Sequence, residues 1–283
     1  MHGADLHLPA GTWDEVTPES AGWTYCGLRV VRVGELVLET DEREFAVLPL
    51  AGSLTVEVDG ERFELAGRES VFSRVSDWAY LPRGSRARLV GDAEVALASA
   101  RAERRFEPAY IPADAVPLEI RGAGMATRQV VNFMSPDGFG GADRLICVEV
   151  LTPDGNWSSY PPHKHDDTPG SLSNNEEIYY FRVGRTGAPG TSDEGFALHR
   201  TYTADGSIDA TVVVRDGDVF LVPRGYHGPT VAAPGYPLYY LNVMAGPNED
   251  RTMAIVDDPP YAWVRSSWEA MQVDPRVPLI AAA

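Results

Sequence analysis

Short runs of β-forming residues, separated by turn residues, follow one another along most of this chain. Such runs cover residues 28–33, 35–40, 44–50, 54–58 and 61–65, continue at 70–72, 78–81 and 86–90, and resume at 128–133 and 143–151. Gly52 and the pair Asp59 and Gly60 supply turn signals between them. Many short strands at close spacing, with no convincing helix, predict an all-β fold of the sandwich or barrel type.

Two motifs of the first half of the chain return in the second half. Residues 45–52 correspond to residues 177–184, and residues 80–86 correspond to residues 221–227, with a shared Pro-Arg-Gly turn. The offset is larger for the second pair, so the second half carries a loop extension, which we place at 185–195. Two related β units in one chain are the simplest account of the repeat.

A change of composition separates the two halves. Residues 101–105 are rich in charge, and Pro108, Pro112 and Pro117 follow, which predicts a surface linker over 101–127. We therefore expect an N-terminal domain over 1–127, linker included, and a C-terminal domain with its tail over 128–283. The tail is predicted to form one short helix at 266–271, and its aromatic residues to pack onto a barrel or a neighbouring subunit, so a homo-oligomer is compatible with it.

Composition and charge narrow the functional classes. The chain is 44% hydrophobic and 23% charged, and its formal charge of −17 opposes binding to nucleic acid and to anionic membranes. A small anionic substrate stays open, because a local cation can outweigh a distant field. No apolar run approaches the ~20 residues that a spanning helix needs, and the N-terminus does not resemble a signal peptide. We expect a cytoplasmic protein in which Cys26 and Cys147 are buried thiols.

Two histidines one residue apart mark the stretch with the clearest chemistry. On a strand, His163 and His165 point to the same side, and a carboxylate, Glu176 or Glu177, follows. Such a face can begin a metal site, and His227, after the repeated turn, is the candidate for the third imidazole. The other histidines, His2, His7 and His199, lack ligand-like spacing and are expected to be surface or core residues.

The first half of the chain lacks these side chains at the corresponding positions. It has Phe45 where the second half has Glu177, Arg86 where the second half has His227, and no His-x-His. We therefore predict that the first unit is a structural partner and that the second unit binds the metal.

The paired motifs resemble those of the cupin superfamily. That family combines Gly, His-x-His, Glu and Gly in a first motif with Gly, Pro-x-Gly and His in a second. The positions that match are Gly155, His163, His165, Glu177, Gly184, Gly217, Pro223, Gly225 and His227. Three spacings depart from the family pattern: Gly155 to His163, His165 to Glu177, and Gly225 to His227. The spacing to Gly184 selects Glu177 over Glu176, and alternation then places Glu177, Tyr179 and Phe181 on the inner face.

A narrower resemblance covers most of the chain. Residues 157–166, 176–181 and 244–247 are similar to segments of the 5-deoxy-glucuronate isomerase family, which is related to the 5-keto-4-deoxyuronate isomerases. The resemblance implies a bicupin, with two jelly-roll β-barrels, that converts 5-deoxy-D-glucuronate to 5-dehydro-2-deoxy-D-gluconate in myo-inositol catabolism. The ligand set His163, His165, Glu177 and His227 suits a divalent Zn, Mn, Fe, Co or Ni ion.

An aldose–ketose isomerase moves hydrogen between adjacent carbons, through an enediol or by a hydride shift. Either route develops negative charge on oxygen, which a divalent ion stabilises. Besides Glu177, we consider Tyr179 as a catalytic residue, against a role as a core aromatic. Lys164, the only lysine, is a candidate for the substrate carboxylate, against an outward position set by strand parity. Arg224 is the other cationic candidate, against a role as a solvated turn residue.

Three other functions are alternatives to this one. A cupin dioxygenase uses similar ligands, an isomerase for another uronate or keto-sugar acid would need similar residues, and a non-catalytic storage cupin would usually lack the ligands. Turnover without oxygen distinguishes the first of these from an isomerase.

Overall fold

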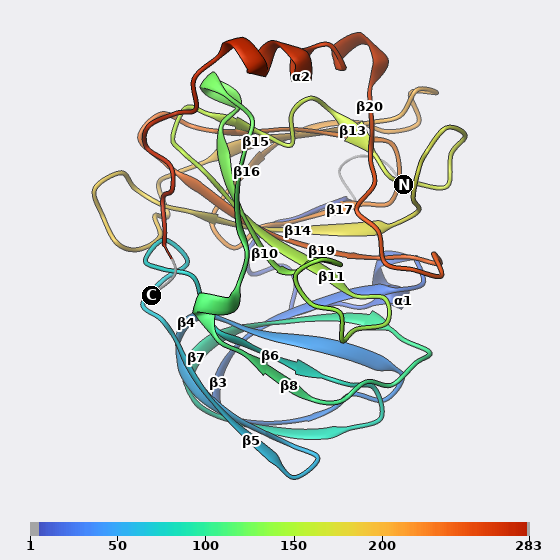
Figure 1. Ribbon diagram of the computed structural model, residues 1–283, viewed down its shortest axis with the longest axis vertical. Coiled ribbons are helices and arrows are strands. Elements are labelled where there is room, and N and C mark those ends of the chain that lie inside the picture. Colours follow the sequence, from blue (N-terminus) through green and yellow to red (C-terminus); the bar gives the residue numbers. More distant parts are fainter. Residues whose placement is uncertain (1–5, 282–283) are drawn as a thin grey trace.

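The computed structural model describes residues 6–281 and has two β-barrel units, one above the other along the long axis of the molecule (Figure 1). The prediction of an all-β chain is confirmed, because every helix is four residues or shorter. The helical pieces are α1 (Pro18–Ala21), η2 (Ala113–Ala115), η3 (Gly124–Ala126), η4 (Pro259–Tyr261), α2 (Val264–Ser267) and η5 (Trp268–Ala270). Within residues 6–281, no helix has the length and apolar character needed to cross a bilayer.

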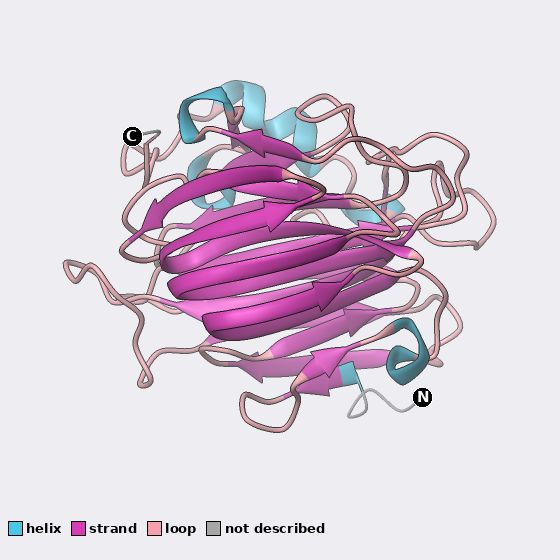
Figure 2. Ribbon diagram, turned by 90° about the horizontal axis from the view of Figure 1, so that it is seen from below, coloured by secondary structure: helices cyan, strands magenta, loops and turns pink. Residues whose placement is uncertain are grey.

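The N-terminal unit, which faces the viewer in Figure 2, is one sheet built on three long strands that pair side by side. These are β3 (Cys26–Glu39), β4 (Arg43–Val58) and β7 (Arg86–Arg101). Each pairing of β7 with β3 or β4 contains a register shift, and such bulges let long strands bend. The sheet runs β2-β3-β7-β4-β6-β8 with β5 on β4, the shorter strands being β2 (Glu15–Val16), β5 (Glu61–Arg68), β6 (Trp78–Leu81) and β8 (Ala109–Ile111).

The C-terminal unit has two sheets, and both supply side chains to the site described below. The seven-stranded sheet runs β1 (His7–Leu8), β17 (Val219–Val222), β14 (Glu176–Val183), β19 (Leu238–Ala245), β11 (Ile146–Thr152), β10 (Arg128–Met134) and β9 (Leu118–Arg121). The six-stranded sheet runs β16 (Asp209–Val214), β15 (Ala197–Tyr202), β18 (Tyr226–Ala232), β13 (His163–Lys164) and β20 (Val256–Asp257), with β12 (Trp157–Ser158) also on β18.

The two units repeat the same strand pairing, as the repeated motifs predict. Phe45 of β4 pairs with Leu81 of β6, and the equivalent Glu177 of β14 pairs with Val222 of β17. Phe45 is buried in an apolar cluster of the N-terminal unit that contains Val47, Leu89 and Leu97 among others. The first barrel therefore has hydrocarbon where the second has a carboxylate.

A shared core joins the units. One apolar cluster includes Leu48 and Trp78 from the N-terminal unit together with Phe133 and Tyr239 from the C-terminal unit. A buried ion pair between Arg68 and Glu149 crosses the same boundary. Cys26 and Cys147 are free and buried, as expected.

Short strands from the start of the chain and from the linker form the edges of the sheets. The first strand, β1, pairs with β17 of the C-terminal unit although it lies at the start of the chain. Within the expected linker 101–127, β8 pairs with β6 of the N-terminal unit and β9 pairs with β10 of the C-terminal unit. The segment thus adds an edge strand to each unit, because its Pro residues limit pairing to short stretches.

Residues after β19 cross back over the C-terminal unit. The expected helix at 266–271 is present as α2 and η5, which begin two residues earlier and end one residue earlier. The segment returns to the boundary between the units, where Ile280 is buried and the Ala281 carbonyl accepts a hydrogen bond from Val75 N (3.0 Å).

Candidate metal centre

Two imidazoles meet by cross-strand pairing. His163 of β13 pairs directly with His227 of β18, so the two side chains lie on the same face, with ring centroids 4.5 Å apart. His165 follows the end of β13, two residues after His163, and its side chain points to the same face. Its ring lies 4.8 Å from the ring of His227. The parity argument from the sequence therefore holds, although β13 itself is only two residues long.

The carboxylate comes from the opposite sheet. Glu177 Oε2 lies 3.0 Å from His165 Nε2 and 3.0 Å from His227 Nε2. Candidate ligand atoms of these three buried residues all lie within 4.8 Å of one another. His163 stands next to this group, with its ring 6.4 Å from that of His165. The six-stranded sheet thus supplies three imidazoles, and the seven-stranded sheet supplies one carboxylate.

The hydrogen bonds of the rings test whether the cluster fits a cation. Nδ1 of His163 lies 3.1 Å from the carbonyl of Pro161, and Nδ1 of His165 lies 3.1 Å from the carbonyl of Asn175. A carbonyl can only accept, so each Nδ1 carries a proton. The Nε2 of His163 then keeps a lone pair, and the Nε2 of His165 shares a hydrogen bond with Glu177 in the absence of a cation. Nδ1 of His227 has no hydrogen-bond partner among the described residues, and its Nε2 faces Glu177 Oε2 at 3.0 Å. Oriented imidazoles and one anionic oxygen are a suitable donor set for a divalent transition metal.

Burial and charge set the protonation of the cluster. Burial, together with the neighbouring His227 and His165, holds the pKa of His163 well below its usual range. Burial alone would raise the pKa of Glu177, but His227 and His165 outweigh it and lower that pKa strongly. Burial would lower the pKa of His165, but the hydrogen bond and charge of Glu177 raise it. The carboxylate is therefore ionised over the whole physiological range.

The turn before His227 is attached to the loop after the His-x-His. Asp166 accepts hydrogen bonds from Gly225 N (2.7 Å) and Ser171 Oγ (2.8 Å). Gly225 has φ +91°, and a Cβ there would meet the Tyr202 carbonyl at 2.5 Å, so only glycine fits. Asp166 thereby links the two cupin-like motifs.

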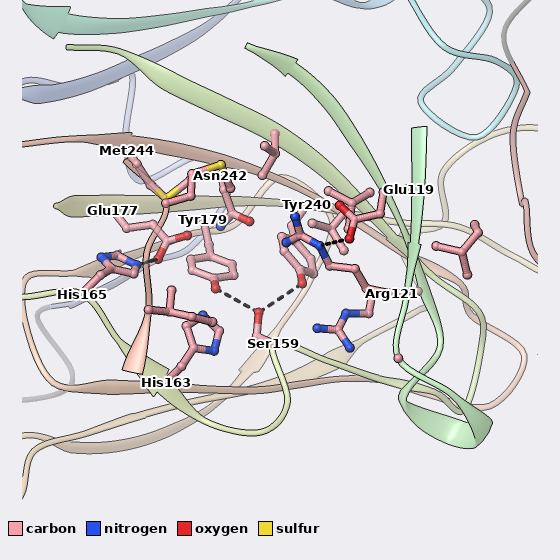
Figure 3. Close-up of a pocket in the computed structure, with 18 of the residues that line it drawn as sticks. Glu119, Arg121, Ser159, His163, His165, Glu177, Tyr179, Tyr240, Asn242 and Met244 are labelled. Carbon is pink, nitrogen blue, oxygen red and sulfur yellow. Dashed lines mark hydrogen bonds and ion pairs between the residues drawn. The ribbon is translucent and has the colours of Figure 1, made fainter. Parts of the chain in front are cut away.

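A cavity of about 470 Å³ opens beside the cluster, within the usual range for small-molecule sites. Tyr179 lines it two residues along β14 from Glu177, and its hydroxyl shares a 3.0 Å hydrogen bond with Ser159 Oγ. Ser159 Oγ also lies 3.1 Å from the Tyr240 hydroxyl. Figure 3 shows the arrangement along the cavity: His163, His165 and Glu177 at one end, Tyr179, Ser159 and Tyr240 in the middle, and Glu119 and Arg121 at the other end.

The cationic candidates from the sequence lie away from the cavity. The Lys164 ammonium donates to Thr168 Oγ1 (2.6 Å) and to the Pro169 carbonyl (3.0 Å), on the side of the strand opposite His163. Arg224 is exposed and donates to Ser207 Oγ (2.9 Å). Neither side chain lines the cavity, so the alternatives given for them, an outward strand position for Lys164 and a solvated turn for Arg224, describe where they lie. Strand parity, the alternative for Lys164, decides its position.

The remaining candidates have structural positions. Glu176 points to the N-terminal unit and accepts hydrogen bonds from the backbone N–H groups of residues 24–26. His199 is fully buried between the hydroxyls of Thr230 and Thr201. Burial, with the charge of His227, lowers the pKa of His199 to about 3. His7 pairs with Asp218 (2.8 Å), and His2 lies outside the described residues.

Sequence reasoning missed several side chains in the middle and at the far end of the cavity. They come from β9, β10, β19 and the tail, and are Arg121, Arg128, Tyr240, Asn242, Arg265 and Trp268. Period-two alternation along 238–245 would have grouped Tyr240 with Asn242. No local signal brings Arg128 and Trp268 to the same cavity, because they meet only through packing of the tail.

Comparison with known proteins gives consistent results. The model of the KduI/IolB family matches residues 9–264. A 5-deoxy-glucuronate isomerase of Geobacillus kaustophilus is 44% identical over 89% of this chain and 90% of its own length, and one of Bacillus subtilis is 39% identical over 88% and 91%. The crystal structure of an IolB-like protein from Salmonella typhimurium superposes with a TM-score of 0.83 at 34% identity, covering 92% of this chain and 98% of that one.

More distant structural relatives share the fold alone. Bacillus subtilis oxalate decarboxylase, a protein with Mn(II) centres, superposes with a TM-score of 0.56 at 14% identity, over 86% of this chain and 74% of its own. The expected fold of two cupin barrels is thereby confirmed.

Proposed function

This chain belongs to the KduI/IolB family, and from that premise we propose that it is a 5-deoxy-glucuronate isomerase, which converts 5-deoxy-D-glucuronate to 5-dehydro-2-deoxy-D-gluconate. The observation that carries the proposal is the His/Glu cluster at one end of a cavity large enough for a six-carbon acid. In the reaction, the hydrogen on C2 moves to C1 and the proton of the C2 hydroxyl moves to the C1 oxygen, so an aldehyde becomes an alcohol and an alcohol becomes a ketone.

We assign His163, His165, Glu177 and His227 as the residues that hold a divalent ion. Such an ion, when bound, polarises a carbonyl oxygen and stabilises developing negative charge, which is worth several kcal/mol. The chain contributes the orientation: the Pro161 and Asn175 carbonyls direct the Nε2 lone pairs of His163 and His165 inward. Glu177 adds the single negative charge of the set.

Tyr179 acts as a hydrogen-bond donor to a substrate oxygen. Burial and the charge of Glu177 hold the pKa of the Tyr179 phenol well above its usual range, so the hydroxyl keeps its proton throughout the working pH. Its bond to Ser159 Oγ fixes the ring in place next to the imidazoles. A fixed, neutral donor stabilises charge on oxygen without needing to reorganise.

The function is tested with purified protein and 5-deoxy-D-glucuronate, followed by NMR. We expect the 2-deoxy-5-keto acid to form, to form equally well under argon, and to stop forming when a chelator removes the ion. A failure to form this product would assign the site to another sugar acid, and a requirement for oxygen would favour a dioxygenase. In D₂O, deuterium at the former C1 indicates an enediol route, whereas its absence indicates a hydride shift.

A further inference from the structure

The register of the seven-stranded sheet orders the side chains on the floor of the cavity. Inward-facing residues that are paired across neighbouring strands form a row on the floor of the cavity. The next row is two residues further along each strand, because side chains alternate between the two faces. From the metal cluster outward, the rows are Glu177 with Met244, then Tyr179 with Asn242 and Val148, then Tyr240 with Val150 and Val130, and then Arg128 with Arg121.

Arg128 is the buried cation in the last of these rows. Its side chain lines the cavity and is 6% exposed, and Nη1 donates to the Ala126 carbonyl (3.0 Å). The guanidinium lies 5.5 Å from the centre of the Trp268 ring, which the tail places over it. No carboxylate of residues 6–281 forms an ion pair with it. Desolvation lowers its pKa to about 10, as expected for a buried charge without a counter-ion.

The other two arginines of the cavity already have partners. Arg121 Nε lies 2.8 Å from Glu119, and Arg265 binds Asp257 through Nε (2.5 Å) and Nη2 (2.7 Å). Both charges are therefore compensated within the chain. A buried cation is unfavourable unless an anion pairs with it, so Arg128 is the arginine of this cavity that can accept an external anion.

A series of cavity side chains leads from the cluster toward Arg128. The Tyr179 ring lies 6.0 Å from that of His227, and Ser159 Oγ bridges the hydroxyls of Tyr179 and Tyr240 at 3.0 and 3.1 Å. Burial raises the pKa of Tyr240, and the charge of Arg128 is near enough to oppose that rise. A six-carbon chain with its carbonyl at the cluster would run past these hydroxyls toward the guanidinium.

We infer that Arg128 binds the substrate carboxylate and so fixes which end of the sugar acid meets the metal cluster; the inference rests on the proposed function. Arginine pairs with carboxylates through two parallel N–H···O bonds, and Ala126 and Trp268 hold this guanidinium in one orientation. The carboxylate would supply the counter-ion that the chain does not.

The residues between Arg128 and Tyr179 suit the rest of the acid. Val130, Val148 and Val150 line this part of the cavity. In 5-deoxy-D-glucuronate, the carbon next to the carboxylate carries no hydroxyl. With the carboxylate on Arg128, that methylene lies against valine side chains, where a hydroxyl would have no hydrogen-bond partner among them.

The test compares two substrates that differ only in charge. 5-Deoxy-D-glucose has an alcohol in place of the carboxylate of 5-deoxy-D-glucuronate. We expect the native enzyme to prefer the acid, and Arg128→Gln to lower kcat/KM for the acid by about 10- to 100-fold, the loss typical of a charged hydrogen bond. Its kcat/KM for the alcohol should stay within about twofold, which also shows that the variant folds. Arg128→Lys keeps the positive charge but cannot form the two parallel N–H···O bonds of a guanidinium. It should retain part of the preference for the acid over the alcohol.

Arg121→Gln is the matched control, because it removes a neighbouring arginine whose charge is already paired, and it should leave the preference for the acid intact. An equal loss on both substrates in Arg128→Gln, or loss of the preference in Arg121→Gln instead, would overturn the assignment. If the native enzyme does not isomerise the acid, the proposed function fails separately. Calorimetric titration with the acid then still tests whether Arg128 binds the carboxylate. The inference requires that the acid bind to Arg128→Gln at least tenfold more weakly than to the native protein.

Discussion

Each imidazole of the candidate centre depends on a particular neighbour. His163 and His165 are oriented by the backbone carbonyls of Pro161 and Asn175, whereas His227 has no such partner in the described chain and is placed by strand pairing with His163. At the scale of single residues, the cluster therefore consists of ring nitrogens that face one carboxylate oxygen. A cation is the group that satisfies them together.

Removal of His227 should abolish metal binding while the fold persists. His227→Ala deletes a ring that contacts both other imidazoles. We expect metal affinity to fall by at least about 100-fold, because losing merely a hydrogen-bond partner of a ligand typically costs 10- to 100-fold. Metal content after gel filtration measures this. The matched control is His199→Gln, equally buried but without ligand spacing, which should keep its metal; a metal-loaded His227→Ala would contradict the assignment.

Asp166 should stabilise the protein in a pH-dependent manner. Burial would raise its pKa, but hydrogen bonds from Thr168, Gly225 and Ser171 outweigh burial and lower it. A lowered carboxyl pKa gives stability that is present above the unfolded value, about 4, and is lost as the pH falls through the folded value. Asp166→Ala should therefore cost roughly 1–3 kcal/mol of unfolding free energy at pH 7, and less at pH 3. Urea unfolding at both pH values measures it; an equal deficit at both would refute the argument.

At the scale of the element, β14 divides its chemistry between two faces. Alternation directs Glu177 and Tyr179 to the cavity, and Glu176 to the N-terminal unit, where it accepts three backbone N–H groups. Two adjacent carboxylates thus have unrelated partners. One is available to a metal, and the other holds the start of β3 against the C-terminal unit.

Substitution of these neighbours should separate metal binding from stability. Glu177→Gln removes the only negative charge of the cluster, so we expect loss of metal and of activity. Glu176→Gln should keep the metal, but should lower the free energy of unfolding by roughly 1–3 kcal/mol, because an amide offers one acceptor oxygen where the carboxylate has two. Metal analysis and urea unfolding of both variants provide the comparison. If Glu176→Gln lost the metal and Glu177→Gln kept it, Glu176 and not Glu177 would be the metal ligand, and the assignment of the two faces of β14 would be wrong.

At the scale of the whole molecule, polar and apolar contacts make the two units depend on each other. Arg68 of β5 pairs with Glu149 of β11, whose carboxylate also accepts from the Tyr239 hydroxyl (2.8 Å). Both partners of the ion pair are fully buried, and apolar residues of both units share one core cluster. We expect the chain to unfold in a single cooperative transition.

Breaking this pair should destabilise both units together. Arg68→Met leaves Glu149 buried without its cation, for which we expect a loss of roughly 3–5 kcal/mol. Arg32→Met is the matched control, because Arg32 and Asp92 form an exposed pair, and such pairs contribute ~1 kcal/mol or less. Calorimetry should show one transition shifted downward for Arg68→Met. Two separate transitions would show that the units fold independently.

The division of labour between the units predicts the metal stoichiometry. Within residues 6–281, the only group of His, Cys, Asp and Glu side chains that could hold an ion lies in the C-terminal unit. The full chain should therefore bind one divalent ion, and His227→Ala none. A second equivalent that survives in His227→Ala would place a metal in the N-terminal unit and contradict the predicted domain roles.

Much of the site followed from local rules. Strand alternation is a property of the backbone, so His163 with His165, and Glu177 with Tyr179, could be assigned to common faces from sequence spacing. The repeat of 45–52 in 177–184 likewise predicted two barrels, and the Phe45 position predicted which barrel lacks the carboxylate. Helix boundaries in the tail were less accurate, because packing against the barrel decides where such short turns begin.

By itself, the sequence determined the kind of side chains at the centre and the face of the strand on which each lies, because both depend on residues a few positions apart. Only the tertiary structure decided which cationic side chains line the cavity. Lys164 lies next to the histidines in the chain but turns to the 166–169 loop, whereas Arg128 reaches the cavity from another strand. Its position depends on the register of β9, β10 and β11 and on the tail that carries Trp268. Such pairings join residues distant in sequence, and no local pattern encodes them.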